Sequence, residues 1–487
     1  MLPFATLIPV DKTLLLPAYQ QVANAVVQQI RNGVIRPGAL LPGTREMARM
    51  LTLHRKTIIA AYDELAAQGW LTVMPRKGFI VARELPEIKP KHWHSNPGNG
   101  YGHKMPGLFY GATGVNTLPV IVGNPLLIIN DGHPDTRLAP MTLLHREYRS
   151  LLKKQHVFKQ LSTAVAPGSL KLRQTMTGYM ARTRGLQLQV QNILITHGAQ
   201  MSIYIASSLL IRAGDYVLAG EPGYFIANQV FEYLGARVIK VPVDQQGMDI
   251  NAVEKACRQH TIRMLYLIPH HHHPTTVTLS PERRMRLLEL AEQFNFTIVE
   301  DDYDYDFHYA SSPYLPLAGS NHHNRVIYIG SFSKALSTSI RIGFMIAAAD
   351  FIVQAVHLRR LIDLKGDHVM EDALASLIEN GDIERHLKKV NKIYLNRRDH
   401  LSSLLDEHLR GIATHHTPAG GMAIWTVFDK SHPLQEIAAK AARHGLFVPD
   451  GKQFDTQHAV YNAFRFGFAS MDLSELSEAV KIIAGCM

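Results

Sequence analysis

Apolar side chains recur at helical spacing in three segments near the start of the chain. The first covers residues 15–31 and ends at Asn32-Gly33. The second covers residues 44–51, where Thr44 is the expected N-cap, and the third covers residues 55–68. We therefore expect three consecutive short helices.

Two strand-like runs follow these helices. They are Trp70–Val73 and Phe79–Ala82, and the turn Pro75–Gly78 between them contains an arginine and a lysine. Three helices followed by a basic hairpin predict a winged helix-turn-helix, in which the third helix reads DNA and the hairpin is the wing.

Farther along, short apolar runs alternate with longer helical patterns. The runs are Ile193–Ile195, Tyr216–Leu218, Val238–Val241, Met264–Ile268, Thr297–Val299 and Val326–Ile329. Such alternation is typical of a mainly parallel sheet with crossover helices on both faces. Ligands of these α/β folds bind at the carboxyl ends of the strands. After about residue 350, helical segments and the candidate strands Met422–Val427 and Ala463–Phe468 predict a smaller α+β lobe.

Glycine and proline are frequent between the two patterns, and periodic apolar positions are few. We therefore expect a DNA-binding domain over residues 13–84, a flexible linker over residues 85–114 and a second domain over residues 115–487.

The composition is that of an ordinary globular protein, with 46% hydrophobic and 19% charged residues among 487. No apolar run reaches the length of a membrane helix, and no signal-like segment opens the chain, so we expect a cytoplasmic protein without a membrane partner. Cys257 and Cys486 are the only cysteines and allow no disulfide framework. Residues 1–90 hold eleven Lys or Arg against six Asp or Glu, which is half of the net charge of +10. This excess favours binding to a polyanion.

Lys334 stands in the run Ser331-Phe332-Ser333-Lys334, directly after an apolar strand, and Arg341 follows. A lysine in this place can form a Schiff base with an aldehyde cofactor. Ser331, Ser333 and Arg341 can hold a phosphate, because hydroxyl and guanidinium groups donate to its oxygens. The run predicts a pyridoxal 5'-phosphate site.

Other strand ends supply the remaining parts of such a site. Asp301 can keep a pyridinium nitrogen protonated, and Tyr303 can reach the phenolic oxygen of the ring. The sequence Gly198-Ala199-Gln200 opens a helix whose amides can bind the phosphate. Tyr224 can stack on the pyridine, although a core tyrosine is the alternative. Arg465 lies in an apolar strand, where its charge requires a partner such as the carboxylate of an effector.

Two clusters raise the question of a metal. Five acidic residues lie between Glu300 and Asp306, but the intervening aromatic residues and the missing glycine argue against a calcium loop. The four histidines His270–His273 precede a proline. We favour a structural or ligand-facing turn over a metal site there and predict no metal, although the role of the run stays open.

The N-terminal region resembles the GntR family of regulators. The match includes Pro37-Gly38, Arg45, Arg55-Lys56-Thr57, Ala61-Tyr62 and Gly78. The resemblance implies that Arg45, Arg55 and Thr57 contact the phosphates and groove of an operator, and Lys56 and Lys77 are further candidates.

The C-terminal region resembles the fold-type I aminotransferases in the order of its motifs. The whole chain, with Gly132-His133-Pro134-Asp135 before the first helix of the large domain, resembles the MocR regulators. That family implies a transcription factor that uses pyridoxal phosphate and senses a small amine or amino acid. It also implies a homodimer in which each DNA-binding head lies head-to-tail against the partner's aminotransferase-like domain.

The chain departs from the family pattern at two places. His270–Thr276 replaces a Ser-His-Gln-aromatic-Pro-Thr-Gly turn, and Leu161–Ala164 replaces an element with a tyrosine that would reach the partner's phosphate. The effector is therefore open.

Three functions are compatible with the sequence. The first is a regulator that senses an amine, an amino acid or pyridoxal phosphate itself, with little or no transaminase turnover. The second is an active aminotransferase that carries a DNA-binding head. The third is a DNA-binding protein with a cofactor-free scaffold. The pairing of a DNA reader with a full set of cofactor residues favours the first.

Overall fold

The computed structural model describes residues 2–14, 16–75, 78–85, 125–154, 165–309, 314–456 and 459–487. The chain forms two compact units, residues 1–110 and 111–487. The predicted linker lies outside the described residues except for Leu85, and the predicted Leu161–Ala164 departure lies outside them entirely.

The N-terminal unit has the predicted order of three helices and a two-stranded antiparallel wing. The elements are α1 Phe4–Leu7, α2 Ala18–Arg31, α3 Thr44–Met50, α4 Arg55–Ala67, β1 Leu71–Met74 and β2 Gly78–Val81. Their apolar faces form one core, in which Val22, Val26 and Ile58 are fully buried. The winged helix-turn-helix prediction is confirmed. The short α1 was not predicted.

The prediction of Thr44 as an N-cap is wrong. Gly43 is the N-cap of α3, and Thr44 is the first helical residue. The Thr44 hydroxyl instead accepts a hydrogen bond from Arg55 Nε at 3.4 Å, which links the starts of α3 and α4.

A mainly parallel eight-stranded sheet forms the centre of the C-terminal unit. In sheet order the strands are β4 Ile193–Thr196, β11 Gly343–Ile346, β10 Val326–Ser331, β9 Thr297–Asp301, β8 Ile262–Leu267, β5 Tyr216–Glu221, β6 Arg237–Asp244 and β7 Gly247–Met248. All six predicted strands are present. The sheet also contains two short strands that were not predicted, β11 and β7, and both pair antiparallel.

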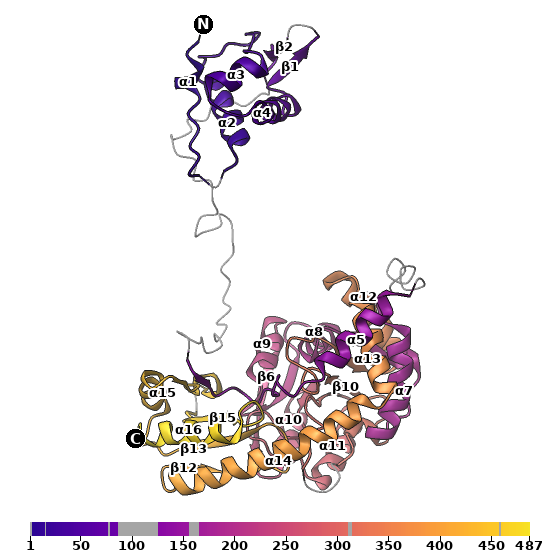
Figure 1. Cartoon of the computed structure of the whole chain (residues 1–487). Helices are drawn as coiled ribbons and strands as arrows, with labels where there is room; N and C mark the ends of the chain where they lie inside the picture. Colours follow the sequence, from indigo (N-terminus) through magenta and orange to yellow (C-terminus); the bar gives the residue numbers. More distant parts are fainter. Residues whose placement is uncertain are drawn as a thin grey trace. The chain divides into compact units, whose positions relative to one another are not determined.

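Helices cover both faces of this sheet (Figure 1). They are α5 Met141–Leu152, α7 Leu170–Arg184, α8 Ala199–Leu210, α9 Phe225–Tyr233, α10 Ile250–Gln259, α11 Pro281–Phe294, α12 Ala349–Ile362 and α13 His368–Glu379. On β5, Val217 and Ala219 pack in one core with residues of α8, α9 and α12. Leu218, which points the other way, packs with residues of α10 and α11. Burial on both faces explains why the strands read as continuous apolar runs.

The smaller lobe has a three-stranded antiparallel sheet, as the two candidate strands indicated. Its elements are β12 Ala413–His415, β13 Ala423–Phe428, α15 Leu434–Arg443, β15 Ala463–Gly467 and α16 Leu473–Ala484. The long helix α14, Asp382–His408, extends beside this lobe and packs on α16 (Figure 1). A short parallel pair of β3, Leu127–Ile128, and β14, Leu446–Phe447, joins the segment before α5 to the lobe. Among the described residues, no helix has the length and apolarity needed to cross a membrane.

Candidate functional site

Several strand ends of the C-terminal unit meet at one cavity of about 510 Å³. The carboxyl ends of β9 and β10, the loop after β5 and the start of α8 all contribute to its wall. Nine of the ten predicted cofactor residues line it: Ala199, Gln200, Tyr224, Asp301, Tyr303, Ser331, Ser333, Lys334 and Arg341. The tenth, Gly198, is the N-cap of α8. The fold therefore brings the predicted residues together, while the role of each stays a prediction.

One end of the cavity is suited to an anion. Gly198 has φ +85° and ψ 168°, a conformation that is open essentially only to glycine. The Arg341 guanidinium packs directly on it and donates a hydrogen bond to His197 O at 3.2 Å. Within the described part of the chain, no carboxylate lies within ion-pair distance of this guanidinium. Its charge and the free amides at the start of α8 can therefore bind a phosphate.

Asp301 presents an unpaired acceptor in the same cavity. Its Oδ2 accepts a hydrogen bond from the Tyr266 hydroxyl at 2.6 Å, whereas its buried Oδ1 has no partner among the described residues. Burial raises the pKa of Asp301 to about 7; the Tyr266 hydrogen bond opposes this effect, and Asp302 and Asp304 add to it. Such a carboxyl group fits a cationic N–H donor like a pyridinium.

Lys334 follows β10 and is half-buried. Its Nζ donates a hydrogen bond to Gly132 O at 2.6 Å and lies 5.7 Å from the centre of the Tyr303 ring. Burial lowers the pKa of Lys334 to about 8, with partial opposition from the charge of Asp131. A lysine with this pKa has a usable neutral fraction near physiological pH, as a nucleophile for an aldehyde requires.

Two tyrosines complete the wall around Lys334. Tyr224 donates a hydrogen bond to Gln200 Oε1 at 3.3 Å, and its ring meets His273 edge-on. Tyr303 donates to His271 O at 3.2 Å. Their predicted contacts with a cofactor ring stay predictions.

These observations fit pyridoxal 5'-phosphate. Gly198 and Arg341 at the anion-binding end match the phosphate of that cofactor. The unpaired Asp301 Oδ1 matches its ring nitrogen, and Lys334 matches its aldehyde. Its size also suits a cavity of about 510 Å³.

The segment before α5 is part of the site, and the sequence patterns assigned no role to its first residues. Asn130, Asp131 and His133 line the cavity, and Gly132 supplies the carbonyl that Lys334 contacts. The signal available in the sequence was the abrupt change from the apolar run Leu126–Ile129 to polar residues.

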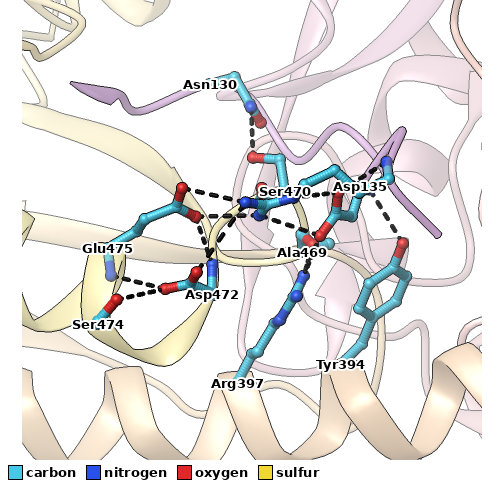
Figure 2. A network of polar contacts seen from close by, with 10 residues as sticks. Asn130, Asp135, Tyr394, Arg397, Ala469, Ser470, Asp472, Ser474 and Glu475 are labelled. Atoms are coloured by element: carbon cyan, nitrogen blue, oxygen red, sulfur yellow. Dashed lines mark hydrogen bonds and ion pairs between the residues drawn. The ribbon is translucent and has the colours of Figure 1, made fainter. Parts of the chain in front are cut away.

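A polar network fixes this segment against the smaller lobe and α14 (Figure 2). Asn130 donates a hydrogen bond to Ser470 Oγ at 2.7 Å. The buried Asp135 carboxylate accepts from Arg397 at 3.0 Å, and its backbone N–H donates to the Tyr394 hydroxyl at 3.0 Å. These contacts, of which the Arg397–Asp135 bond is buried and charge-assisted, hold the turn that carries Asp131 and Gly132.

Arg465 lies on β15, and only 2% of its side chain is exposed. Its Nε is 2.6 Å from Asp131 Oδ1, and its two other nitrogens donate to Pro274 O at 3.2 Å and to the Tyr303 hydroxyl at 3.4 Å. The predicted partner of Arg465 was an effector carboxylate. Within the chain itself, Asp131 is the partner.

The four histidines follow β8 and are all buried. Each bonds a different partner: His270 contacts Asp302 at 3.1 Å, His271 contacts Asp304 at 3.0 Å, His272 contacts Thr275 at 2.9 Å and His273 contacts Asp131 at 2.7 Å. Across the described ranges, no three His, Cys, Asp or Glu side chains are grouped so that they could hold a metal. The run is a buried turn, and one of its members, His273, lines the cavity.

The predicted DNA contacts lie at the starts of two helices of the N-terminal unit. Arg45 on α3 and Arg55 and Lys56 on α4 are exposed, and Thr57 is half-buried. The His54 side chain caps α4 by accepting from Lys56 N at 3.2 Å. Lys77 lies outside the described residues. The side chains of both arginines are exposed, as contact with a phosphate backbone requires, and Arg55 also donates to Thr44.

Two protein-family models match the chain. Residues 149–483 match "Aminotransferase class I and II", and residues 18–81 match "Bacterial regulatory proteins, gntR family".

Relatives with both regions match almost the full length. The chain is 26% identical to the HTH-type pyridoxine biosynthesis transcriptional regulator PdxR of Corynebacterium glutamicum, over 95% of this chain and 96% of that protein. It is 25% identical to the probable rhizopine catabolism regulatory protein MocR of Rhizobium meliloti, over 96% and 94%. Among solved structures, kynurenine aminotransferase of Pyrococcus horikoshii matches with a TM-score of 0.69 and 26% identity, over 75% of this chain and 91% of that chain.

Proposed function

The chain belongs to the aminotransferase class I and II family and, through its gntR region, to the MocR-type regulators, and we propose that it senses a small amine or amino acid through pyridoxal phosphate. In this proposal Lys334 holds the cofactor, and the occupied cavity alters binding of the N-terminal unit to an operator. Bound there, pyridoxal phosphate supplies an aldehyde that exchanges amines and a ring that withdraws electrons.

The chain's own residues would divide the work as follows. Arg341 and the amides at the start of α8 hold the phosphate, and Asp301 keeps the ring nitrogen protonated. Lys334 supplies the amine, and Gly132 O holds its proton-bearing nitrogen in place. On the N-terminal unit, Arg45, Arg55, Lys56 and Thr57 contact the operator, with Lys77 as a further candidate on the wing.

One observation carries this proposal: a winged helix-turn-helix with exposed arginines and a cavity with a full set of cofactor residues occur in one chain. The test is a pair of measurements on the full chain. Incubation with pyridoxal phosphate should produce the visible absorption of a lysine-bound cofactor, and a panel of amines should then change operator affinity in a gel-shift titration. Operator binding that ignores both cofactor and amines would contradict the sensing role.

An aminotransferase with a DNA-binding head is the second candidate, because Lys334 and Asp301, which amine transfer would need, line the same cavity. Multiple turnovers of amino transfer to a keto acid, abolished in Lys334→Ala, would favour this candidate. A single exchange without turnover would favour the sensor.

We further propose a homodimer in which the DNA-binding heads are exchanged head-to-tail, as the family resemblance implies. Two heads match the two half-sites of a symmetric operator. Sedimentation of the full chain with and without operator DNA tests this, and a monomer bound to a single half-site would contradict it.

A further inference from the structure

Three groups of the chain lie against the Arg465 guanidinium. Asp131 forms an ion pair with it, and two of its nitrogens donate hydrogen bonds to Pro274 O and to the Tyr303 hydroxyl. A ligand carboxylate that binds Arg465 therefore competes with Asp131 for the charge of the guanidinium. Of these three contacts, only the one with Asp131 joins opposite charges: Arg465 Nε lies 2.6 Å from Asp131 Oδ1 in a buried site, as an ion pair without hydrogen-bond geometry.

Asp131 lies between Arg465 and the cavity. Asp131 is part of the cavity wall and 39% of its side chain is exposed, whereas Arg465 is only 2% exposed and is not among the described residues that line the cavity. A molecule in the cavity therefore meets a carboxylate in the place where a guanidinium was expected.

The position of Asp131 is fixed from several sides. His273 Nε2 donates to its second oxygen at 2.7 Å, and the network around Asn130 and Asp135 holds the backbone on either side (Figure 2). A β-carbon placed on the next residue, Gly132, would lie 3.4 Å from the Arg465 guanidinium, so the turn packs closely against the arginine.

Burial raises the pKa of Asp131, but His273 and Arg465 outweigh it and hold the pKa well below its usual range. The group is therefore an anion at physiological pH.

The charge of Asp131 acts on the place where an amine would react. Burial lowers the pKa of Lys334, and among its charged neighbours Asp131 raises that pKa more than Arg465 lowers it, so the charge of Asp131 favours an ammonium at that position. The remaining wall is largely apolar and includes Ile203, Phe225 and Phe447.

We propose that Asp131 masks Arg465 and makes the cavity selective for primary amines with an apolar body and no carboxylate on the carbon that bears the nitrogen. Such an amine gains attraction from Asp131 and contact with the apolar wall. The corresponding amino acid brings a carboxylate that faces Asp131 and finds Arg465 already paired. This inference rests on the proposed amine-sensing function and names the class of amine.

The test compares pairs that differ only by the carboxylate, such as phenethylamine with L-phenylalanine and isoamylamine with L-leucine. Binding is measured by calorimetry on the full chain loaded with pyridoxal phosphate. The wild type should bind each amine at least about tenfold more tightly than its amino acid, as expected for one favourable charge contact replaced by an unfavourable one. Equal or tighter binding of the amino acid would overturn the inference.

Variants locate the cause. Asp131→Asn frees Arg465 and should lower the amine preference by about tenfold or reverse it, whereas Asp131→Glu keeps the charge and should keep the preference. Asp350→Asn, at an exposed carboxylate at the start of α12, is the matched control and should leave the ratio unchanged. An unchanged ratio in Asp131→Asn would overturn the inference. If Asp131→Asn does not fold, the wild-type and Asp131→Glu ratios still decide.

Different results would refute the amine-sensing function and the selectivity for amines without a carboxylate. A full chain that never develops the absorption of a lysine-bound cofactor would refute the proposed function and this inference with it. A chain that shows the absorption but prefers amino acids would refute the inference alone.

Discussion

Asp301 and Asp302 are adjacent, both are buried, and yet their pKa values move in opposite directions. Asp301 has one partner, Tyr266, and burial raises its pKa to about 7. Burial also acts on Asp302, but His270 and the hydroxyl of Tyr328 help to hold its pKa below the usual value. Neighbouring carboxylates of similar burial therefore have different tasks, one open to a ligand and one structural.

This difference predicts opposite effects of Asp→Asn substitution on the cofactor-free protein. The folded state holds a proton on Asp301 up to about pH 7, whereas the unfolded state releases it near pH 4, so stability is lost as the pH rises between these values. Asp301→Asn should remove that loss and raise stability above pH 7 by ~1–3 kcal/mol, with little effect near pH 4. Asp302→Asn should destabilise the protein at neutral pH, because its carboxylate is stabilised when charged. Thermal unfolding of both variants from pH 4 to pH 8 checks this, and a pH-independent effect of Asp301→Asn would contradict it.

The residues that meet in the cavity could be predicted from sequence only where a short motif marks them. Lys334 and Asp301 follow recognisable strands and were placed in one site. The pairing of Arg465 with Asp131 joins residues more than three hundred positions apart, and no local pattern reports such a contact. The sequence correctly indicated that Arg465 needed a carboxylate but could not show that the chain supplies one.

At the scale of elements, the start of α8 determines the shape of the anion-binding end of the cavity. Gly198 and Arg341 pack so closely that a β-carbon at Gly198 would lie 2.5 Å from Arg341 Nη2. The loop from β4 to α8 and the segment after β10 are therefore matched in shape, and only glycine permits both the backbone conformation and the contact.

Gly198→Ala should therefore reduce the affinity for pyridoxal phosphate by about tenfold or more, because the new methyl group displaces Arg341. Gly214→Ala is the matched control, since Gly214 also has a positive φ, +92°, but a β-carbon there meets nothing within 4 Å. Both variants should lose ~1 kcal/mol of stability from backbone strain, whereas only Gly198→Ala should lose cofactor affinity. Fluorescence titration with the cofactor measures the difference. Equal affinities in the two variants would refute the role of Gly198 and Arg341 in binding the phosphate.

The starts of α3 and α4 carry the predicted operator contacts. Arg45→Ala and Arg55→Ala should each weaken binding and should each lower the slope of log K against log salt by about 1, because one phosphate contact is lost. Arg410→Ala, at an exposed arginine of the C-terminal unit, should change neither quantity. Anisotropy titrations at several salt concentrations check this. A salt slope that stays at the wild-type value in Arg55→Ala would remove Arg55 from the interface.

Elements could be predicted where their periodicity was long and their burial uniform. Five of the six parallel strands were recognisable because nearly all of their residues are buried, whereas most residues of β6 are half-buried or exposed. The strand β7 has only two residues and was missed, since so short a run cannot be distinguished from a loop. The strand β11 was also missed, although it has four residues like the predicted β4. Thr44 was misplaced as a cap by one residue, which is the usual uncertainty of helix boundaries.

At the scale of the whole molecule, the chain joins a DNA-binding unit to a cofactor unit, and each unit has its own core. This organisation could be predicted because the hydrophobic period, the charge and the glycine content all change along the chain. How occupancy of the cavity is passed to the DNA-binding unit could not be predicted, because coupling depends on contacts that no sequence period encodes.

The most direct test of amine sensing is the operator affinity of the full chain, measured by fluorescence anisotropy with cofactor alone and with cofactor plus a saturating amine. The wild type should show a change of at least about fivefold on addition of the amine, the lower end of typical coupling between two sites. Lys334→Ala should show no change, because it cannot hold the cofactor covalently. An amine response that persists in Lys334→Ala, or a wild type that binds its operator equally in both states, would contradict the proposed function.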